Sequence, residues 1–222
     1  MNVRYILFIL SLSLNLFCYS ANDYLYVIQN VDGKYGFINQ KGEVVITPQF
    51  DKVSLFSESI ARVKIGDKCG YIDKEGKMVI TPQFDRAGDF SEGLAMVEID
   101  GKYGYIDKEG KMVVTPQFDR AYSFSEGLAK VEIDDKYGYI DKEGKMVITP
   151  QFDNAYNFSE GLALVKIDDK YGYIDKEGKM VITPQFDRAY QFGNGLANVR
   201  LADKFYAYID KTGKVVYNYR TK

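Results

Sequence analysis

The chain has 222 residues, with 29 Lys and Arg against 31 Asp and Glu, a formal net charge of −2, and neither histidine nor tryptophan. Without histidine, Ser-His-Asp sites, Cys-His sites and histidine-bound metals are excluded. The charges are interspersed, so the basic patch that nucleic-acid binding needs is missing and no nucleic-acid partner is expected.

The first residues have the composition of a secretory signal peptide, which we place at residues 1–20. Arg4 supplies one positive charge, residues 5–17 are mostly apolar, and small residues follow up to Ser20. The apolar run is too short to span a membrane comfortably. We expect cleavage after Ser20 and an extracytoplasmic protein (secreted, periplasmic or at the cell surface), with no membrane span in the mature chain. The alternative is a lipoprotein signal in which acylated Cys18 tethers the protein to a surface.

Residues 21–222 are built from one repeated unit. The segment KYGYIDKEGKMVITPQFD at 136–153 returns unchanged at 170–187 and nearly unchanged twice before. Turn glycines from Gly42 to Gly178 recur every 34 residues, which indicates six units. Such a period is typical of solenoids, propellers and arrays in which neighbouring units share a core.

Each unit is expected to contain three antiparallel strands, because it is rich in Val, Ile and Tyr and alternates with period two. A two-residue loop at Asp134-Asp135 and a three-residue loop ending at Gly144 would connect them. This register predicts Gly138 opposite Ile148. It also gathers one apolar face, made of Ala129, Val131, Ile133, Gly138, Ile140, Met146 and Ile148.

Glycine and proline recur at fixed structural positions of the unit. The proline is expected to end the third strand, after which the chain returns as an irregular fourth strand or a packed loop. These motif residues are Gly36, Gly70, Gly104, Gly138, Gly172, Pro48, Pro82, Pro116, Pro150 and Pro184.

The fold prediction is an all-β protein: six tandem antiparallel β-meander units stacked as an open twisted array. The last unit supports an open array, because Ala207 replaces the motif glycine there, as in a degenerate capping repeat. A closed six-bladed β-propeller is the alternative.

The unit resembles the WG repeat, also called the KWG repeat, of bacterial proteins. The likeness covers residues 23–222 and lies in Lys-aromatic-Gly, Tyr-Ile-Asp, the turn glycine, Pro-x-Phe-Asp and Glu-Gly-Leu-Ala, in that order. The resemblance implies a non-catalytic module that mediates interactions, and it carries no catalytic residue. The Trp of the family is replaced by Tyr35, Cys69, Tyr103, Tyr137 and Tyr171 and by the pair Phe205-Tyr206.

No catalytic, cofactor or metal site is expected. Asp141 and its copies flank a turn, which explains them without chemistry. Cys69 occupies an aromatic position and is expected to be a small buried hydrophobe. The DKEG turn lacks the alternating oxygen ligands of a calcium loop.

Two functions remain open. The first is a secreted or surface-tethered scaffold that binds partner proteins, and the alternative is a binder of cell-envelope glycan through repeated aromatic sites such as Tyr103/Tyr105. We favour motif tyrosines that pack on neighbouring units. Function is then expected on exposed residues that vary between units: Met96, Glu98, Lys130, Glu132, Leu164, Lys166, Tyr122, Tyr156 and Tyr190.

Overall fold

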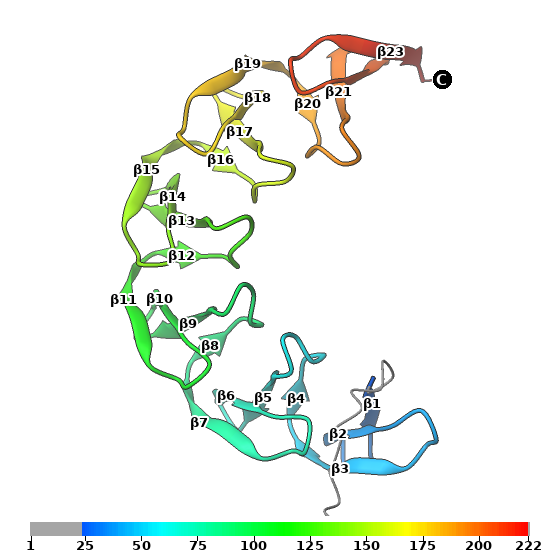
Figure 1. Cartoon of the computed structure of the whole chain (residues 1–222), viewed down its shortest axis with the longest axis vertical. Helices are drawn as coiled ribbons and strands as arrows, with labels where there is room; N and C mark the ends of the chain where they lie inside the picture. Colours follow the sequence, from blue (N-terminus) through cyan, green and yellow to red (C-terminus); the bar gives the residue numbers. More distant parts are fainter. Residues whose placement is uncertain (1–23, 222) are drawn as a thin grey trace, which may run out of the picture.

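The computed structural model describes residues 24–221, and all regular structure in this range is β-strand. The expected signal peptide and Cys18 lie outside the described residues. Six antiparallel sheets follow one another along the chain, with three strands in the first and four in each of the others. They form an open arc whose two ends stand apart (Figure 1). The predicted open array is therefore confirmed.

The first sheet contains β1 (Tyr26–Gln29), β2 (Tyr35–Ile38) and β3 (Val44–Phe50). The second contains β4 (Lys52–Val53), β5 (Ala61–Ile65), β6 (Lys68–Ile72) and β7 (Met78–Phe84). The third contains β8 (Arg86–Ala87), β9 (Ala95–Ile99), β10 (Lys102–Ile106) and β11 (Met112–Phe118). The fourth contains β12 (Arg120–Ala121), β13 (Ala129–Ile133), β14 (Lys136–Ile140) and β15 (Met146–Phe152). The fifth contains β16 (Asn154–Ala155), β17 (Ala163–Ile167), β18 (Lys170–Ile174) and β19 (Met180–Phe186). The sixth contains β20 (Arg188–Ala189), β21 (Ala197–Ala202), β22 (Phe205–Ile209) and β23 (Val215–Arg220).

Within a sheet the strands lie in chain order from the concave to the convex side of the arc. The short strands β4, β8, β12, β16 and β20 lie towards the concave side, and β7, β11, β15 and β19 follow the convex edge (Figure 1). The return segment after each third strand therefore becomes the inner strand of the next sheet.

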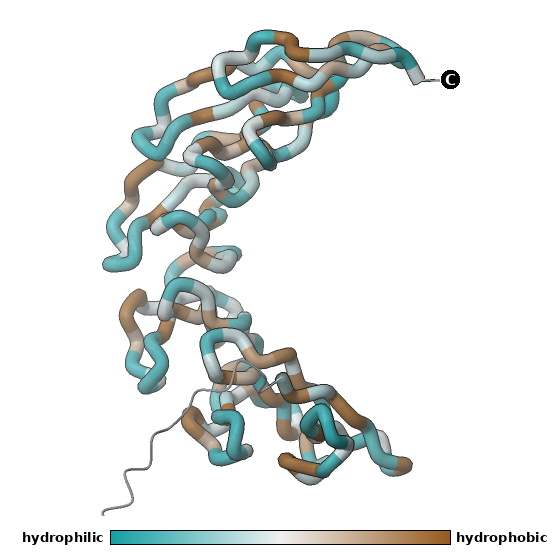
Figure 2. Tube along the Cα trace, turned by 45° about the vertical axis from the view of Figure 1, so that its right-hand side comes forward, coloured by the Kyte–Doolittle hydropathy of each residue, from teal (hydrophilic) through white to brown (hydrophobic). Residues whose placement is uncertain are grey.

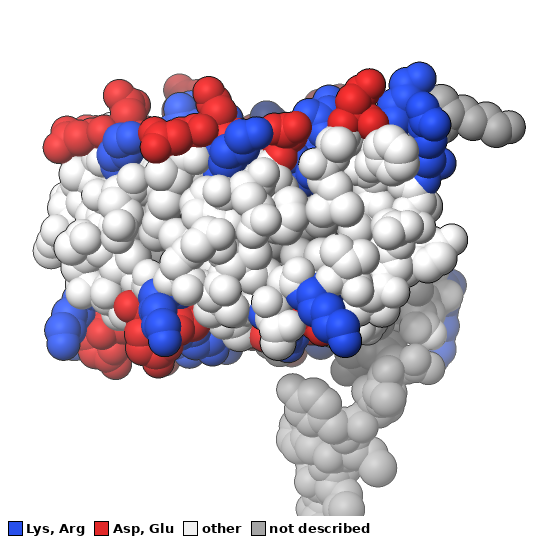
Figure 3. Space-filling model, turned by 90° about the horizontal axis from the view of Figure 1, so that it is seen from above, with Lys and Arg blue, Asp and Glu red and all other residues white. Residues whose placement is uncertain are grey.

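The hairpins form as predicted. Asp134 and Asp135 have φ angles of 51° and 60°, and Ile133 pairs with Lys136 across them. Gly144 adopts the left-handed conformation, with φ 84°. The charged side chains of such turns lie along two opposite borders of the molecule, separated by a band of uncharged residues (Figure 3).

The third strand departs from the predicted register. Tyr139 pairs with Ile148 and Tyr137 with Phe152, so the three residues between Ile148 and Phe152 lie opposite Gly138 alone. This bulge holds Pro150, which has no N–H to donate and fits where the ladder is interrupted. The predictions that proline ends the strand and that Gly138 faces Ile148 were wrong.

The motif glycine is required by this bulge. A Cβ on Gly138 would lie 2.4 Å from the Ile148 carbonyl oxygen and 2.8 Å from the Pro150 nitrogen, and the other motif glycines have the same surroundings. In the sixth sheet no proline is present, and Ala207 pairs regularly with Asn218. Alanine is therefore accommodated there.

The core lies between successive sheets. We call the face of a sheet that points to the next sheet its forward face, and the opposite one its back face. Tyr105 and Phe118 on the forward face of the third sheet pack against Val131 and Ile140 on the back face of the fourth. Hydrophobic residues therefore lie along the strands and hydrophilic ones at the turns (Figure 2).

The sequence predicted a single apolar face, whereas the structure buries both faces of the inner sheets. Because the bulge shifts the third strand, Ile148 lies with Tyr139 on the forward face rather than with Ile140 on the back face. The forward face looks polar in the sequence because it carries Lys130 and Glu132 among its aromatic residues.

Candidate interaction surfaces between and beyond the sheets

One tyrosine in each of the second to fifth sheets packs at the interface with the next sheet. Tyr139 is fully buried, its hydroxyl donates a hydrogen bond to the Tyr156 carbonyl oxygen at 2.6 Å, and its ring centroid lies 4.9 Å from that of Phe158. Burial raises the pKa of its phenol. Tyr71, Tyr105 and Tyr173 repeat this arrangement. The prediction that motif tyrosines pack on neighbouring units is confirmed for these four, and none of them is accessible to a glycan.

Four of the nine variable residues predicted to be exposed lie instead in the grooves between sheets. Leu164 is 2% exposed, Glu132 7% and Lys130 9%, while Met96 packs against the core. The prediction of exposure was wrong for these positions, because the polar-looking face of each inner sheet is covered by the next sheet.

The remaining predicted site residues differ in exposure. Glu98, Lys166, Tyr122 and Tyr156 are half-buried, and Tyr190 is exposed. Their roles in binding stay a prediction.

Lys130 is enclosed by aromatic rings. Its Nζ lies 3.7 Å from the ring centroid of Tyr122, 5.0 Å from that of Tyr137 and 5.8 Å from that of Tyr156. It also donates a hydrogen bond to the Ala155 carbonyl oxygen of the next sheet, at 2.7 Å. Burial lowers the pKa of this lysine to about 8. Lys130 thus joins two sheets through a hydrogen bond and cation–π contacts.

On the forward face of each four-stranded sheet, three directly paired residues form a row across its first three strands. In the fourth sheet the row is Arg120, Glu132 and Tyr137, and the Arg120 Nε lies 3.7 Å from the Glu132 Oε2. In the third sheet the corresponding distance from Arg86 to Glu98 is 3.3 Å. The Oε2 atoms of both glutamates are buried and accept no hydrogen bond. In the third and fourth sheets the row therefore places a carboxylate beside an arginine.

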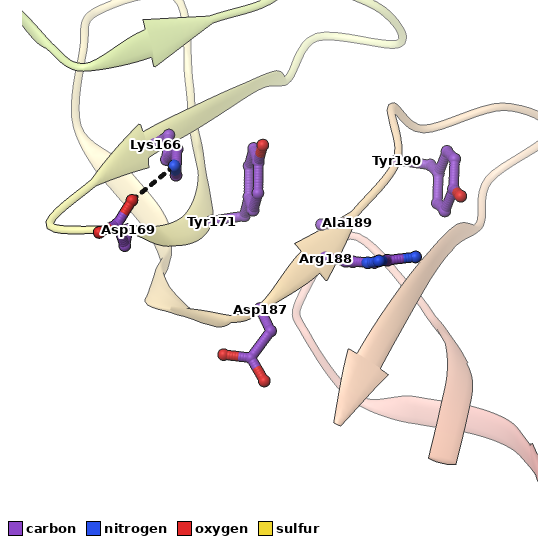
Figure 4. A pocket seen from close by; sticks show the side chains of 7 residues that line it. All are labelled: Lys166, Asp169, Tyr171, Asp187, Arg188, Ala189 and Tyr190. Atoms are coloured by element: carbon purple, nitrogen blue, oxygen red, sulfur yellow. Dashed lines mark hydrogen bonds and ion pairs between the residues drawn. The ribbon is translucent and has the colours of Figure 1, made fainter. Parts of the chain in front are cut away.

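A pocket of about 370 Å³ opens between the fifth and sixth sheets (Figure 4). Leu164 replaces Lys130 at this groove and is buried in the core, so no lysine is enclosed there. Lys166 forms an ion pair with Asp169 at 2.6 Å. The lining residues are Lys166, Asp169, Tyr171, Asp187, Arg188, Ala189 and Tyr190. Two of the predicted site residues, Lys166 and Tyr190, therefore meet at one pocket.

A surface that the sequence analysis missed lies on the forward face of the sixth sheet. Tyr208 occupies the position of Tyr139 but is 40% exposed, because no described sheet follows it. The ring of Tyr219 stacks with three other tyrosines at centroid distances of 5.8, 5.9 and 6.3 Å. We call this surface the terminal tyrosine face; it consists of Tyr206, Tyr208, Tyr217 and Tyr219. The alternating tyrosines of the proline-free last strand were the signal that could have revealed it.

Cys69, the only cysteine among the described residues, is buried as predicted. Within residues 24–221, no three or more Cys, Asp and Glu side chains gather as a metal site would require. Over the same range no helix is long and apolar enough to cross a membrane.

The repeats match the model of the "WG containing repeat" at residues 35–69, 70–103, 103–137, 137–171 and 171–205. Comparison with curated proteins gives no match.

Solved structures of low sequence identity share the β-propeller-like arrangement of sheets. Hsv2p of Kluyveromyces lactis has a TM-score of 0.55 at 9% identity, over 90% of this chain and 82% of that one. BamB from Moraxella catarrhalis has a TM-score of 0.53 at 12% identity, over 90% and 73%. The computationally designed Ika8 protein also has 0.53 at 12%, over 90% and 72%. These likenesses show the fold alone. The repeat matches span most of the chain, which belongs to the WG-repeat family.

Proposed function

We propose that this protein is a non-catalytic scaffold that binds a partner protein through the terminal tyrosine face. The supporting observation is that the counterparts of this face in the preceding sheets are covered. Tyr139 is fully buried, whereas Tyr208 and Tyr217 are 40% and 62% exposed.

The chemistry of the preceding interfaces defines the partner. Each covered forward face meets a back face made of small and branched apolar side chains, such as Ala163, Val165 and Ile174. The partner is therefore a protein that presents a similar apolar β-surface. Exposed tyrosines are favourable anchors for such an interface, because they bury large rings at low entropic cost and keep a hydroxyl for hydrogen bonding. Asn198, which donates a hydrogen bond to the Tyr219 hydroxyl at 2.9 Å, helps to fix the ring.

Repeated aromatic sites for a glycan find less support. The four equivalent motif tyrosines are buried. Three of them have a second tyrosine two residues earlier, and these tyrosines (Tyr103, Tyr137 and Tyr171) are half-buried beside the grooves. The remaining aromatic platform occurs once, at the end of the arc.

Site-specific crosslinking tests the scaffold function. A photoreactive residue at Tyr217 is expected to crosslink the chain to a partner protein in its native cells, and Tyr208→Glu should abolish the crosslink. A photoreactive residue at Tyr26, which is 50% exposed in the first sheet, is the matched control. The proposal is contradicted if the crosslinked species contains only this chain or isolated envelope polysaccharide, or if none forms.

The proposal includes a place of action outside the cytoplasm, on the basis of residues 1–20. Intact-mass analysis of protein from its native cells should give a chain that begins at Ala21. A retained Met1 would contradict export, and a lipid on Cys18 would establish the tethered form.

A further inference from the structure

The cross-strand row in the second sheet has the wrong charges for an internal ion pair. Lys52 lies directly opposite Lys64, and Lys64 lies opposite Cys69. The corresponding residues are Arg86, Glu98 and Tyr103 in the third sheet and Arg120, Glu132 and Tyr137 in the fourth. The second sheet thus has a lysine where the third and fourth sheets have a carboxylate. The fifth and sixth sheets also have a cation there, Lys166 and Arg200, but each of these forms an ion pair with an aspartate.

Like charges directly opposite each other on a sheet are destabilising. Arg62 adds a third cation, because it precedes Lys64 by two residues on the same strand and therefore lies on the same face. Among the described residues, neither Lys52 nor Lys64 has a carboxylate oxygen within 4 Å. The row therefore carries excess positive charge.

The nearest acidic residues already have partners. Asp51 accepts hydrogen bonds from the Lys34 Nζ at 2.5 Å and from the Gly66 N–H at 2.8 Å. Asp89 lies 3.5 Å from Arg62, which also donates to the Ala87 carbonyl oxygen at 2.8 Å. Because these acidic residues already have partners, Lys52 and Lys64 have no counterion among the described residues.

The same place has an open space. A pocket of about 130 Å³ is lined by Lys52, Val53, Arg62, Val63, Lys64 and Cys69, none of which is acidic. In the later grooves the position of Cys69 is occupied by a tyrosine ring. The space admits several water molecules, which suits one small charged group.

We propose that this pocket binds a carboxylate, supplied by a free small acid or by an acidic side chain of a peptide. The internal repeats show the binding mode: the ligand carboxylate takes the place of the Glu98 and Glu132 carboxylates, and Lys52 and Lys64 donate to it. This site is independent of the terminal tyrosine face, so either assignment can fail alone.

The test is an NMR titration of the full chain with sodium acetate and with a hexaglutamate peptide, each against sodium chloride at equal ionic strength. Saturable shifts confined to the backbone amides around Lys52, Lys64 and Cys69 are expected. Shifts with acetate indicate that a free acid suffices, and shifts with the peptide alone assign the site to acidic peptides.

The repeats supply matched variants. Lys64→Glu recreates the ion pair of the third and fourth sheets, so it should fold and bind at least tenfold more weakly. Glu98→Lys with Tyr103→Cys should create a second site in the next groove. Unchanged binding by Lys64→Glu, shifts spread over lysines throughout the chain, or no saturable shift with either probe would overturn the proposal.

Discussion

Tyr139 and Tyr208 occupy the same place in their units, and their surroundings show how one residue type takes two roles. Tyr139 is covered by the next sheet and donates to a carbonyl oxygen, whereas Tyr208 lies at the end of the arc and stays 40% exposed. The sequence predicts the packing of the motif tyrosines because they recur in successive copies together with the motif glycines and prolines. It does not predict which variable residues are covered, since strand alternation says nothing about a second sheet on the polar-looking face.

Replacing Tyr139 with Phe should lower the free energy of unfolding by about 1–2 kcal/mol, because the Tyr156 carbonyl oxygen at the sheet interface loses its hydrogen-bond donor. The matched change Tyr208→Phe should have almost no effect, since water reaches that hydroxyl. Urea unfolding of both variants measures the difference. Equal losses would contradict the assigned difference in burial.

Lys130 makes the free energy of unfolding depend on pH. Burial lowers its pKa to about 8 in the folded state, against about 10.4 in the unfolded chain. Between these values the unfolded chain binds more protons, so this lysine makes stability rise with pH over that interval. Well below pH 8 the lysine is charged in both states, and the cost of burying its charge is present in full. The comparison is best made between pH 8 and 9.5, where most tyrosines of the unfolded chain are still protonated and their partial ionisation is common to wild type and variant.

The variant Lys130→Met should lose this rise while it keeps the apolar part of the side chain. Urea midpoints at pH 8 and pH 9.5 for wild type and variant give the result. An identical rise in the variant would show that Lys130 is not its source.

At the scale of the element, glycine and proline act together to form the bulge of the third strand. The hairpin loops were predictable because their φ angles and loop lengths are local properties of the sequence. The bulge was not, because proline is compatible with the end of a strand as well as with a bulge, and the need for glycine on the opposite strand depends on the fold. Ala207 supports the link, since it occurs in the one sheet without the proline.

Gly138→Ala should cost about 2–3 kcal/mol of stability, because its Cβ would meet backbone atoms that cannot move aside easily. The reverse change Ala207→Gly, at the position without the bulge, should cost only about 0.5–1 kcal/mol through backbone entropy. Denaturant titration distinguishes the two. A tolerated alanine at position 138 would contradict the bulge geometry.

At the scale of the whole molecule, the same side-chain contacts recur between successive sheets, so one inner sheet can pack against the next in the same way each time. Glu92 accepts a hydrogen bond from the Gly127 N–H at 3.0 Å and pairs with Lys142 at 3.1 Å. Ser91 donates to the Phe124 carbonyl oxygen at 2.9 Å. The same contacts recur at later steps, so the sequence period predicts the architecture well. The curvature and the uncovered last face depend on how successive sheets pack and where the arc ends, which no local pattern contains.

A charge placed between sheets should be far more damaging than a missing methyl group there. Ile140→Asp puts a carboxylate without a partner into the buried core against the third sheet and should cost about 3–5 kcal/mol. Ile140→Val should cost about 1 kcal/mol. Chemical unfolding of the two variants provides the measurement, and similar losses would contradict the position of the core.

Deletion of residues 120–153 tests the open array most directly. The change removes the fourth sheet and joins the third to the fifth, whose back face carries the same apolar residues: Ala163, Val165 and Ile174 replace Ala129, Val131 and Ile140. Glu92 would then meet Gly161 and Lys176, the counterparts of its present partners. Since each sheet contacts only its neighbours, the shorter chain should show β-sheet circular dichroism per residue equal to that of wild type and a single cooperative urea transition at lower midpoint. A deletion variant that lacks β-sheet circular dichroism and a cooperative urea transition would contradict the open array.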